Sequence, residues 1–289
     1  MPSSVRNDMQ RQGGFLNLPN DNMFKTIAVA LVLCLVCSII VSTAATLLKP
    51  RQVANKLLDK KQNILLVSGI EGEGQSVDEL FSQIETRVVD LQTGEYTDEV
   101  DAEKYDQRKA SKEAAYRVEL DDDQDIASIG ARAKFASVYL VKNGEELDKI
   151  ILPVHGYGLW STMYGFLALE GDATTVSGIT FYEHGETPGL GGEIENVKWL
   201  ASWQGKQLFN AAGDPSLSVI KGLVNPDSSD AAYQIDGLAG ATLTSNGVTN
   251  LIQYWVGDNA FGPFLDKIKA GQAGNSAATQ NSSISNSQG

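Results

Sequence analysis

An uncharged run of 23 residues, Thr26–Leu48, constrains this chain more than any other feature. The run is rich in valine, leucine, isoleucine and alanine. As a helix rising ~1.5 Å per residue it would extend about 35 Å, enough to cross the ~30 Å hydrocarbon core of a bilayer. It is too long for the apolar core of a signal peptide, commonly about 7–15 residues, although residues 42–45 could mimic a cleavage site. The sequence therefore predicts a permanent membrane anchor.

Charge and rare residue types exclude several classes of function. The chain has 36 acidic and 23 basic residues, a net charge of −13, which repels nucleic acid at long range. Cys34 and Cys37 both lie in the apolar run, so the remainder cannot form disulfides or cysteine-ligated metal centres. Their Cys-x-x-Cys spacing would suit a redox pair, but we interpret them as small apolar residues. With only His155 and His184 elsewhere, we expect no metal site and no nucleic-acid partner.

The pattern of apolar residues changes from helical to strand-like near Ala133. Before that point we expect helices over Ala54–Leu66 and Ser76–Leu91, and a solvated helix or loop in the charge-dense segment Thr93–Asp125. After it we expect strands over Phe135–Val141, Ile150–Val154, Val176–Glu183 and Ser216–Leu223, and helices over Asn196–Gln207 and from Val248 to about Lys269. This order predicts an α+β fold, in which a single transmembrane helix precedes an antiparallel twisted sheet with flanking helices.

A loop of small residues precedes the last amphipathic helix. It reads Asp-Gly-Leu-Ala-Gly-Ala-Thr-Leu-Thr-Ser over residues 236–245, and Ser245 or Asn246 is the expected N-cap. Such a loop at a helix N-terminus can bind an anion, because free N–H groups and the positive end of the helix dipole meet there. On composition alone, a glycine-rich turn that caps a helix is the favoured interpretation. No lysine follows the glycines as in a P-loop, and no G-x-G-x-x-G pattern is present.

Two further motifs precede this loop in the chain. Residues 156–160 read Gly-Tyr-Gly-Leu-Trp, and residues 184–191 read His-Gly-Glu-Thr-Pro-Gly-Leu-Gly. Each alone is also typical of an ordinary turn. Together, in this order, the three motifs resemble the FMN-binding domain family, and residues 236–245 resemble its covalent flavinylation motif. Ala239 stands where that family usually has serine or threonine.

The resemblance implies a role for each matching residue. Thr242 would carry FMN covalently through a phosphoester bond, and no residue is expected to be catalytic. Trp160 and Leu190 would form walls for the flavin ring, while Glu186 and Thr187 would pair with its edge. Outside the three motifs, Lys221 could place a positive charge near the ring or phosphate and favour reduced, anionic flavin. The remaining expected cofactor contacts are Gly191, Leu243 and Thr244, and a maturing flavin transferase would recognise Asp236, Gly240 and Ala241.

Over nearly the whole chain, the sequence resembles the C subunits of sodium-translocating NADH:quinone reductases. This resemblance implies electron relay through FMN between NADH and ubiquinone, with the other subunits of the membrane complex, the flavin transferase and membrane lipid as partners. One alternative is the sister family, the G subunits of Rnf-type ferredoxin:NAD oxidoreductases. The other is a membrane-anchored flavin-binding sensory module. A visible flavin spectrum and the purified partner subunits would discriminate these interpretations.

The sequence divides into five expected segments. They are an N-terminal cytoplasmic tail (1–25), the transmembrane helix (26–48), a periplasmic helical and charged region (49–130), the FMN-binding domain (131–270) and a disordered tail (271–289). Five basic residues follow the membrane run within residues 49–61, and read literally they would keep the domain in the cytoplasm. The family places its flavin domain on the periplasmic side of the inner membrane, and long domains often translocate regardless of charge.

The expected orientation can be tested with reporter fusions. A reporter that is active only in the periplasm, fused after Gly289, should be active in cells that express the full chain. A cytoplasm-specific reporter at the same position should be silent. The opposite pattern would show that the domain stays in the cytoplasm.

Overall fold

The computed structural model describes residues 23–271. The chain divides into two compact units, with the boundary between Leu57 and Leu58. The tails expected at 1–25 and 271–289 lie, apart from residues 23–25 and 271, outside the described residues.

Helix α1 (Met23–Ser68) contains the whole apolar run and continues well beyond it. Among the described residues it is the one helix that is long and apolar enough to cross a membrane. The helix expected over Ala54–Leu66 is therefore not a separate element. Pro50 lies inside α1, and the helix continues past it.

An antiparallel sheet of six strands forms the centre of the second unit, in the order β2-β1-β5-β6-β7-β8. The strands are β1 (Ile84–Asp90), β2 (Glu95–Tyr96), β5 (Phe135–Asn143), β6 (Glu146–Tyr157), β7 (Thr162–Glu170) and β8 (Val176–Glu183). The strands expected within β5, β6 and β8 are confirmed. Gly144, with φ of 66°, makes the turn between β5 and β6.

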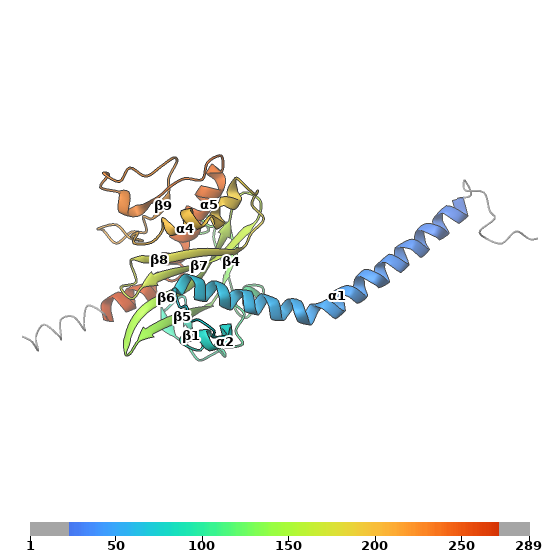
Figure 1. Cartoon of the computed structure of the whole chain (residues 1–289), viewed down its shortest axis with the longest axis horizontal. Coiled ribbons are helices and arrows are strands. Elements are labelled where there is room, and N and C mark those ends of the chain that lie inside the picture. Colours follow the sequence, from blue (N-terminus) through green and yellow to red (C-terminus); the bar gives the residue numbers. More distant parts are fainter. Residues whose placement is uncertain (1–22, 272–289) are drawn as a thin grey trace, which may run out of the picture. The chain divides into compact units, whose positions relative to one another are not determined.

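The sheet buries both faces. One face packs against α4 (Val197–Ala201) and α5 (Thr242–Val256), which Figure 1 shows above the strands. The opposite face packs against the end of α1, through Ile64, Leu65 and Val67. Alternate residues of a strand point to opposite faces, so Leu167 joins the first core and Phe166 the second. The α+β fold predicted from the sequence is confirmed.

Shorter elements surround the sheet. They are α2 (Val77–Phe81), α3 (Gln107–Ala110), the pair β3 (Arg117–Glu119) and β4 (Ala131–Ala133), the 3-10 helices η2 (Gly191–Glu195) and η3 (Ala231–Tyr233), and the parallel pair β9 (Ser218–Val219) and β10 (Gln234–Ile235). A last helical segment covers residues 262–271.

The predicted helix over Ser76–Leu91 is wrong. Ser76 does cap a helix, through a reciprocal pair of hydrogen bonds with Glu79, but this helix, α2, ends at Phe81. Residues 84–90 instead form β1, because all seven pair with β5 and Ile84 and Val88 pack into the core. Tertiary pairing overrides the local helical period here. β1 precedes residue 131, where the flavin domain was expected to begin.

Two more predicted elements are shorter than expected. The helix predicted over Asn196–Gln207 is only α4, because Gly205 takes a positive φ of 77° in the turns that follow. The strand predicted over Ser216–Leu223 is only β9, and Lys221 lies in the loop beyond it.

The contact between α1 and the sheet should contribute strongly to stability. Ile64 is fully buried, whereas Leu66, two residues on, is 69% exposed. Ile64→Ala should lower the free energy of unfolding of the full-length protein by about 2–5 kcal/mol, since it leaves a cavity. Leu66→Ala is the matched control and should cost less than about 0.5 kcal/mol. Equal effects of the two substitutions in denaturant titrations would contradict this assignment.

Candidate cofactor site

Helix α5 begins at Thr242, three residues earlier than the expected cap. Its N-cap is Ala241, which has no side chain that can cap, and Gly240 before it takes a positive φ of 72°. The amide of Ser245 already donates to the Ala241 carbonyl at 3.0 Å, so Ser245 is inside the first turn. The prediction of Ser245 or Asn246 as N-cap is therefore wrong. The Ser245 hydroxyl instead accepts from the Leu238 amide at 3.3 Å.

The first turn of α5 is open to solvent on the side of Thr242. Thr242 is exposed and so is Leu243, whereas Thr244 is fully buried. The first amide groups of a helix have no acceptor within the helix. Because no side chain caps this end, its N–H groups and its dipole favour a negative group beside the Thr242 hydroxyl.

The buried carboxylate of Glu186 joins three segments that are far apart in the sequence. Its Oε2 accepts a hydrogen bond of 2.6 Å from the Thr244 hydroxyl in α5. Its Oε1 accepts from the amides of Leu159 at 3.0 Å and Trp160 at 2.9 Å. Glu186 is only 5% exposed, so these donors replace water around the carboxylate. The three sequence motifs therefore meet at one side chain.

Opposing influences act on the pKa of Glu186. Burial alone would raise the pKa of this carboxyl, but the hydrogen bonds from Thr244 and from the amides of Trp160, Leu159 and Ser161 outweigh it and lower the pKa. The group is therefore ionised at neutral pH. Its negative charge lies beside the first turn of α5, where the helix dipole stabilises it.

His184 braces the loop that carries Glu186. Its Nδ1 accepts from the Glu186 amide at 3.1 Å, and its Nε2 lies 2.9 Å from Glu195 Oε1. The neighbouring Gly185 amide donates to the Ser161 hydroxyl at 2.6 Å. The loop between β8 and η2 is thus tied to the start of β7 and to the end of η2.

Two glycines allow these segments to approach closely. A Cβ on Gly191 would lie 2.5 Å from Thr244 Oγ1, and a Cβ on Gly158 would lie 2.6 Å from Glu186 Oε1. No real side chain tolerates such distances without movement of its neighbours. Gly191 therefore serves the site by its lack of a side chain, which lets the loop lie against α5.

The side chains expected to face a flavin ring are exposed. Trp160 is 65% exposed and Leu190 is 44% exposed, and Thr187 is exposed too. Leu190 lies near the loop of residues 236–245, because a Cβ built on Gly240 would be 3.0 Å from Cδ2 of Leu190. The Thr187 carbonyl accepts from the amides of Leu190 and Gly192, which shapes the loop.

Asp236 comes directly after β10, and Lys221 lies in the loop that follows β9. Asp236 Oδ1 accepts from the Val224 amide at 2.7 Å, and its carbonyl accepts from the indole of Trp199 at 2.8 Å. The Gly237 amide donates to the Gly222 carbonyl at 2.7 Å, so the exposed Lys221 is held beside the base of the Thr242 loop. Asp236 is half-buried and bound to the protein, whereas Gly240 is exposed.

These residues fit an FMN group. An uncapped helix end suits its phosphate, and the exposed apolar side chains of the same three motifs suit its flat, partly apolar ring. Thr242 is exposed, and Ala239 and Gly240, three and two residues before it, are small and exposed, so its hydroxyl is accessible. Thr242 would hold the phosphate, and Trp160, Leu190 and Leu243 would hold the ring.

Sequence reasoning missed the interior of the site. Glu186 and Thr244, both expected to contact the cofactor, also bind each other, which the sequence did not indicate. His184 and the amide of Leu159 were given no role, although both fix Glu186. The motif of residues 184–191, which contains His184, was the one sequence signal that could have indicated its role. The role of the Leu159 amide has no sequence signal, because every residue except proline has a backbone N–H.

The comparisons with known proteins agree with this geometry. The sequence profile described as "FMN-binding domain" matches residues 158–257. The fold, the open helix end and this match define the class: an FMN-binding domain on a chain with an N-terminal apolar helix.

Individual relatives narrow the class to one family. The C subunit of the Na(+)-translocating NADH-quinone reductase of Pseudomonas aeruginosa is 52% identical over 253 residues, 86% of this chain and 97% of that protein. The corresponding protein of Vibrio vulnificus, of the same name, is 54% identical over 253 residues, 87% of this chain and 98% of that protein. The crystal structure of Shewanella oneidensis NqrC matches with a TM-score of 0.70 and 31% identity, over 75% of this chain and 99% of that chain. This chain belongs to the NqrC family, the C subunits of Na(+)-translocating NADH-quinone reductases.

The ionised Glu186 should make stability depend on pH. Its pKa lies below the ordinary value of 4.5, so its contribution is present above that pH and is lost as pH falls through the folded-state pKa. At pH 7, Glu186→Gln should therefore lower the free energy of unfolding by about 1–3 kcal/mol. This difference from wild type should shrink as the pH falls below 4.5 and through the lowered pKa of Glu186 in the folded protein. A difference that stays constant with pH in denaturant titrations would contradict an ionised Glu186.

Proposed function

We propose that this chain is the flavin-carrying subunit of a membrane-bound Na(+)-translocating NADH:ubiquinone reductase and relays electrons through FMN attached to Thr242. The observation that carries the proposal is the exposed Thr242 at the uncapped N-terminus of α5, in a chain whose relatives are named as the C subunits of that enzyme. The partners would be the other subunits of the complex, and the chain would not bind NADH or quinone by itself.

The chemistry of Thr242 supports attachment through the phosphate. A phosphoester at its Oγ leaves one negative charge at the end of α5, which the helix dipole stabilises by about 0.3–1 kcal/mol. Within the described residues, Glu186 is fully engaged with Thr244 and the amides near Trp160, so it is not placed to act as a base for Thr242. Attachment by a separate flavin transferase is consistent with this arrangement, and Asp236, Gly240 and Ala241 remain the residues that we propose it recognises.

The residues around Thr242 would position the ring rather than react with it. When bound, FMN supplies one- and two-electron transfer, and the protein supplies position and electrostatics. Trp160 and Leu190 offer apolar surfaces, and Lys221 a positive charge. Thr187 is exposed on the same loop and is free to pair with the polar edge of the ring. The ionised Glu186 below them fixes the backbone that carries these side chains.

Helix α1 would anchor the protein in the inner membrane, with the flavin domain on the periplasmic side. Its apolar run carries no charged residue between Thr26 and Leu48, so it offers no ion relay of its own. We therefore assign to this chain the transfer of electrons, and to its partner subunits the path of the sodium ion.

Covalent attachment can be tested on denaturing gels. Wild-type protein, co-expressed with a flavin transferase, should give a band that fluoresces under ultraviolet light, because a covalent bond survives denaturation. Thr242→Ala should be expressed but dark. Thr244→Val, which removes a buried hydroxyl two residues further along α5 and keeps the side-chain shape, is the matched control and should remain fluorescent.

Two results would contradict the proposal. A fluorescent Thr242→Ala band would place the attachment on another residue. A dark wild-type band in the presence of the transferase would exclude covalent flavin. Mass spectrometry of the peptide that contains Thr242 identifies the modified residue directly.

A further inference from the structure

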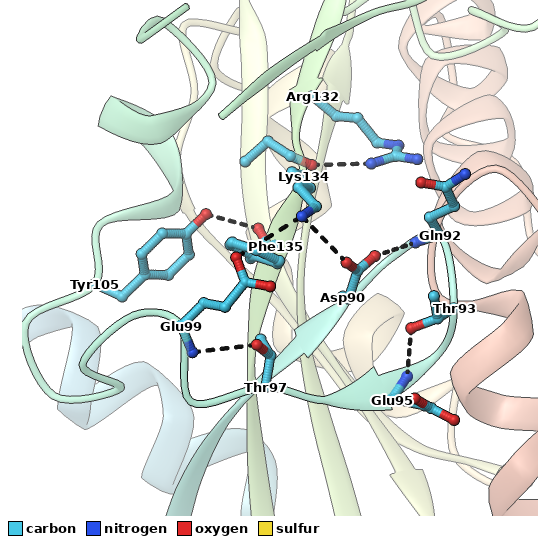
Figure 2. A network of polar contacts seen from close by, with 11 residues as sticks. Asp90, Gln92, Thr93, Glu95, Thr97, Glu99, Tyr105, Arg132, Lys134 and Phe135 are labelled. Atoms are coloured by element: carbon cyan, nitrogen blue, oxygen red, sulfur yellow. Dashed lines mark hydrogen bonds and ion pairs between the residues drawn. The ribbon is translucent and has the colours of Figure 1, made fainter. Parts of the chain in front are cut away.

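The charge-dense segment that follows β2 is fixed to the sheet. Figure 2 shows Tyr105, whose hydroxyl donates to the Phe135 carbonyl of β5 at 2.9 Å. In the same view the ammonium of Lys134 lies between Asp90, at 3.7 Å, and Glu99, at 3.8 Å. This segment was expected to be a solvated helix or loop, but these contacts hold it against the strands.

Arg108 lies three residues beyond Tyr105, on the short helix α3. The Asp106 carboxylate caps α3 by accepting from the amides of Arg108 and Lys109, both at 3.1 Å. The position of the Arg108 backbone is therefore set by two contacts just before it, the Asp106 cap and the hydrogen bond of Tyr105. The cap uses only the backbone amide of Arg108, and its long side chain binds a partner elsewhere in the fold.

That partner is Glu183, 75 residues away in the sequence. The guanidinium of Arg108 donates two hydrogen bonds to its carboxylate, at 2.8 Å and 2.9 Å. The same group lies over the ring of Tyr164, 3.6 Å from the ring centre. A two-pronged pair fixes orientation as well as distance, and contact with an aromatic face adds attraction. The hydrogen bonds to Glu183 raise the pKa of Arg108, so it stays charged.

The ring of Tyr164 is itself supported from behind. It stacks on His155 at 5.3 Å between ring centres, and His155 contacts Trp255 of α5 at 4.8 Å. Burial and the nearby Arg108 lower the pKa of His155 to about 4, so its imidazole is neutral at physiological pH and does not repel the guanidinium. The guanidinium therefore contacts a series of packed rings, Tyr164, His155 and Trp255, and the last of these belongs to α5.

Glu183 is the last residue of β8 and pairs in register with Tyr164 of β7. The register shifts between Tyr164 and Gly165, so regular pairing is already disturbed at this point. The next residue is His184, whose Nδ1 accepts from the Glu186 amide. The strand end that Arg108 grips is thus where the loop of residues 184–191 begins.

We propose that Arg108 is a positioning residue for the flavin loop, residues 184–191. By gripping Glu183 and resting on Tyr164, it fixes the end of β8, and hence the place of His184, Glu186 and Leu190. The consequence for bound flavin rests on the proposed function, whereas the effect on the loop does not. The acidic and basic segment around α3 thereby serves the cofactor site from outside it.

The first experiment measures the loop without flavin. Amide hydrogen exchange is followed in full-length Thr242→Ala protein, alone and with Arg108→Met or Lys109→Met. Peptides covering residues 184–191 should exchange about tenfold faster with Arg108→Met, because the loop opens more often. Lys109→Met removes the adjacent exposed lysine of α3, whose partner is Asp106, and should leave exchange unchanged. Equal exchange in all three proteins would overturn the proposal.

The second experiment uses the flavin as the probe. In chains with Thr242, Arg108→Met should shift the visible absorption or the midpoint potential of the attached flavin, and Lys109→Met should shift neither. A flavin spectrum and potential that Arg108→Met leaves unchanged would overturn the link to the cofactor. If wild type carries no flavin, the proposed function fails, while the exchange experiment still tests the loop.

A charge exchange keeps the test decisive if Arg108→Met unfolds the chain. The double variant Arg108→Glu with Glu183→Arg re-forms the pair in the opposite direction. It should recover slow exchange in residues 184–191, whereas Arg108→Glu alone should not. Circular dichroism shows whether each variant is folded. If residues 184–191 exchange as fast in the folded double variant as in Arg108→Glu alone, the pair does not hold the loop.

Discussion

The site depends on one buried carboxylate. Glu186 collects donors from α5, through Thr244, and from the turn before β7, through the amides of Leu159 and Trp160. Removing any one donor would leave a desolvated charge with fewer partners, which is costly inside a protein. The glycines at 158 and 191 exist in this arrangement because no side chain fits between Glu186 and its neighbours. The backbone that carries the exposed residues that would contact a flavin is thus fixed by hydrogen bonds to the buried Glu186 carboxylate.

The sheet connects Glu186 and its hydrogen-bond donors to the rest of the second compact unit. One face holds α5, whose first residue is Thr242, and the opposite face holds Ile64, Leu65 and Val67 at the end of α1. The helix with the apolar run is therefore continuous with a part of the flavin domain's own core. The last turns of α1, from Leu58 onward, belong to the same compact unit as the sheet.

The chain divides its polar residues between two tasks. Arg108, Glu183, His184 and Glu186 form pairs with protein groups and shape the backbone. Thr242, Thr187 and Lys221 face solvent and are available to a ligand. This division explains why a loop with several polar residues can hold a defined shape while it presents an open, partly apolar surface around the end of α5.

The sequence by itself determined the long apolar helix, the strands within β5, β6 and β8, and the three motifs that meet at the site. These features depend on local composition: an unbroken apolar run, alternating side chains, and glycines next to Thr242. Tertiary structure alone decided that residues 84–90 are a strand, because β5 offers them a partner, and that α5 begins at Thr242 rather than Ser245. It also decided that Glu186 faces Thr244 and that Arg108 reaches Glu183. Contacts across 58 and 75 residues leave no local pattern, because only the folded sheet brings their ends together.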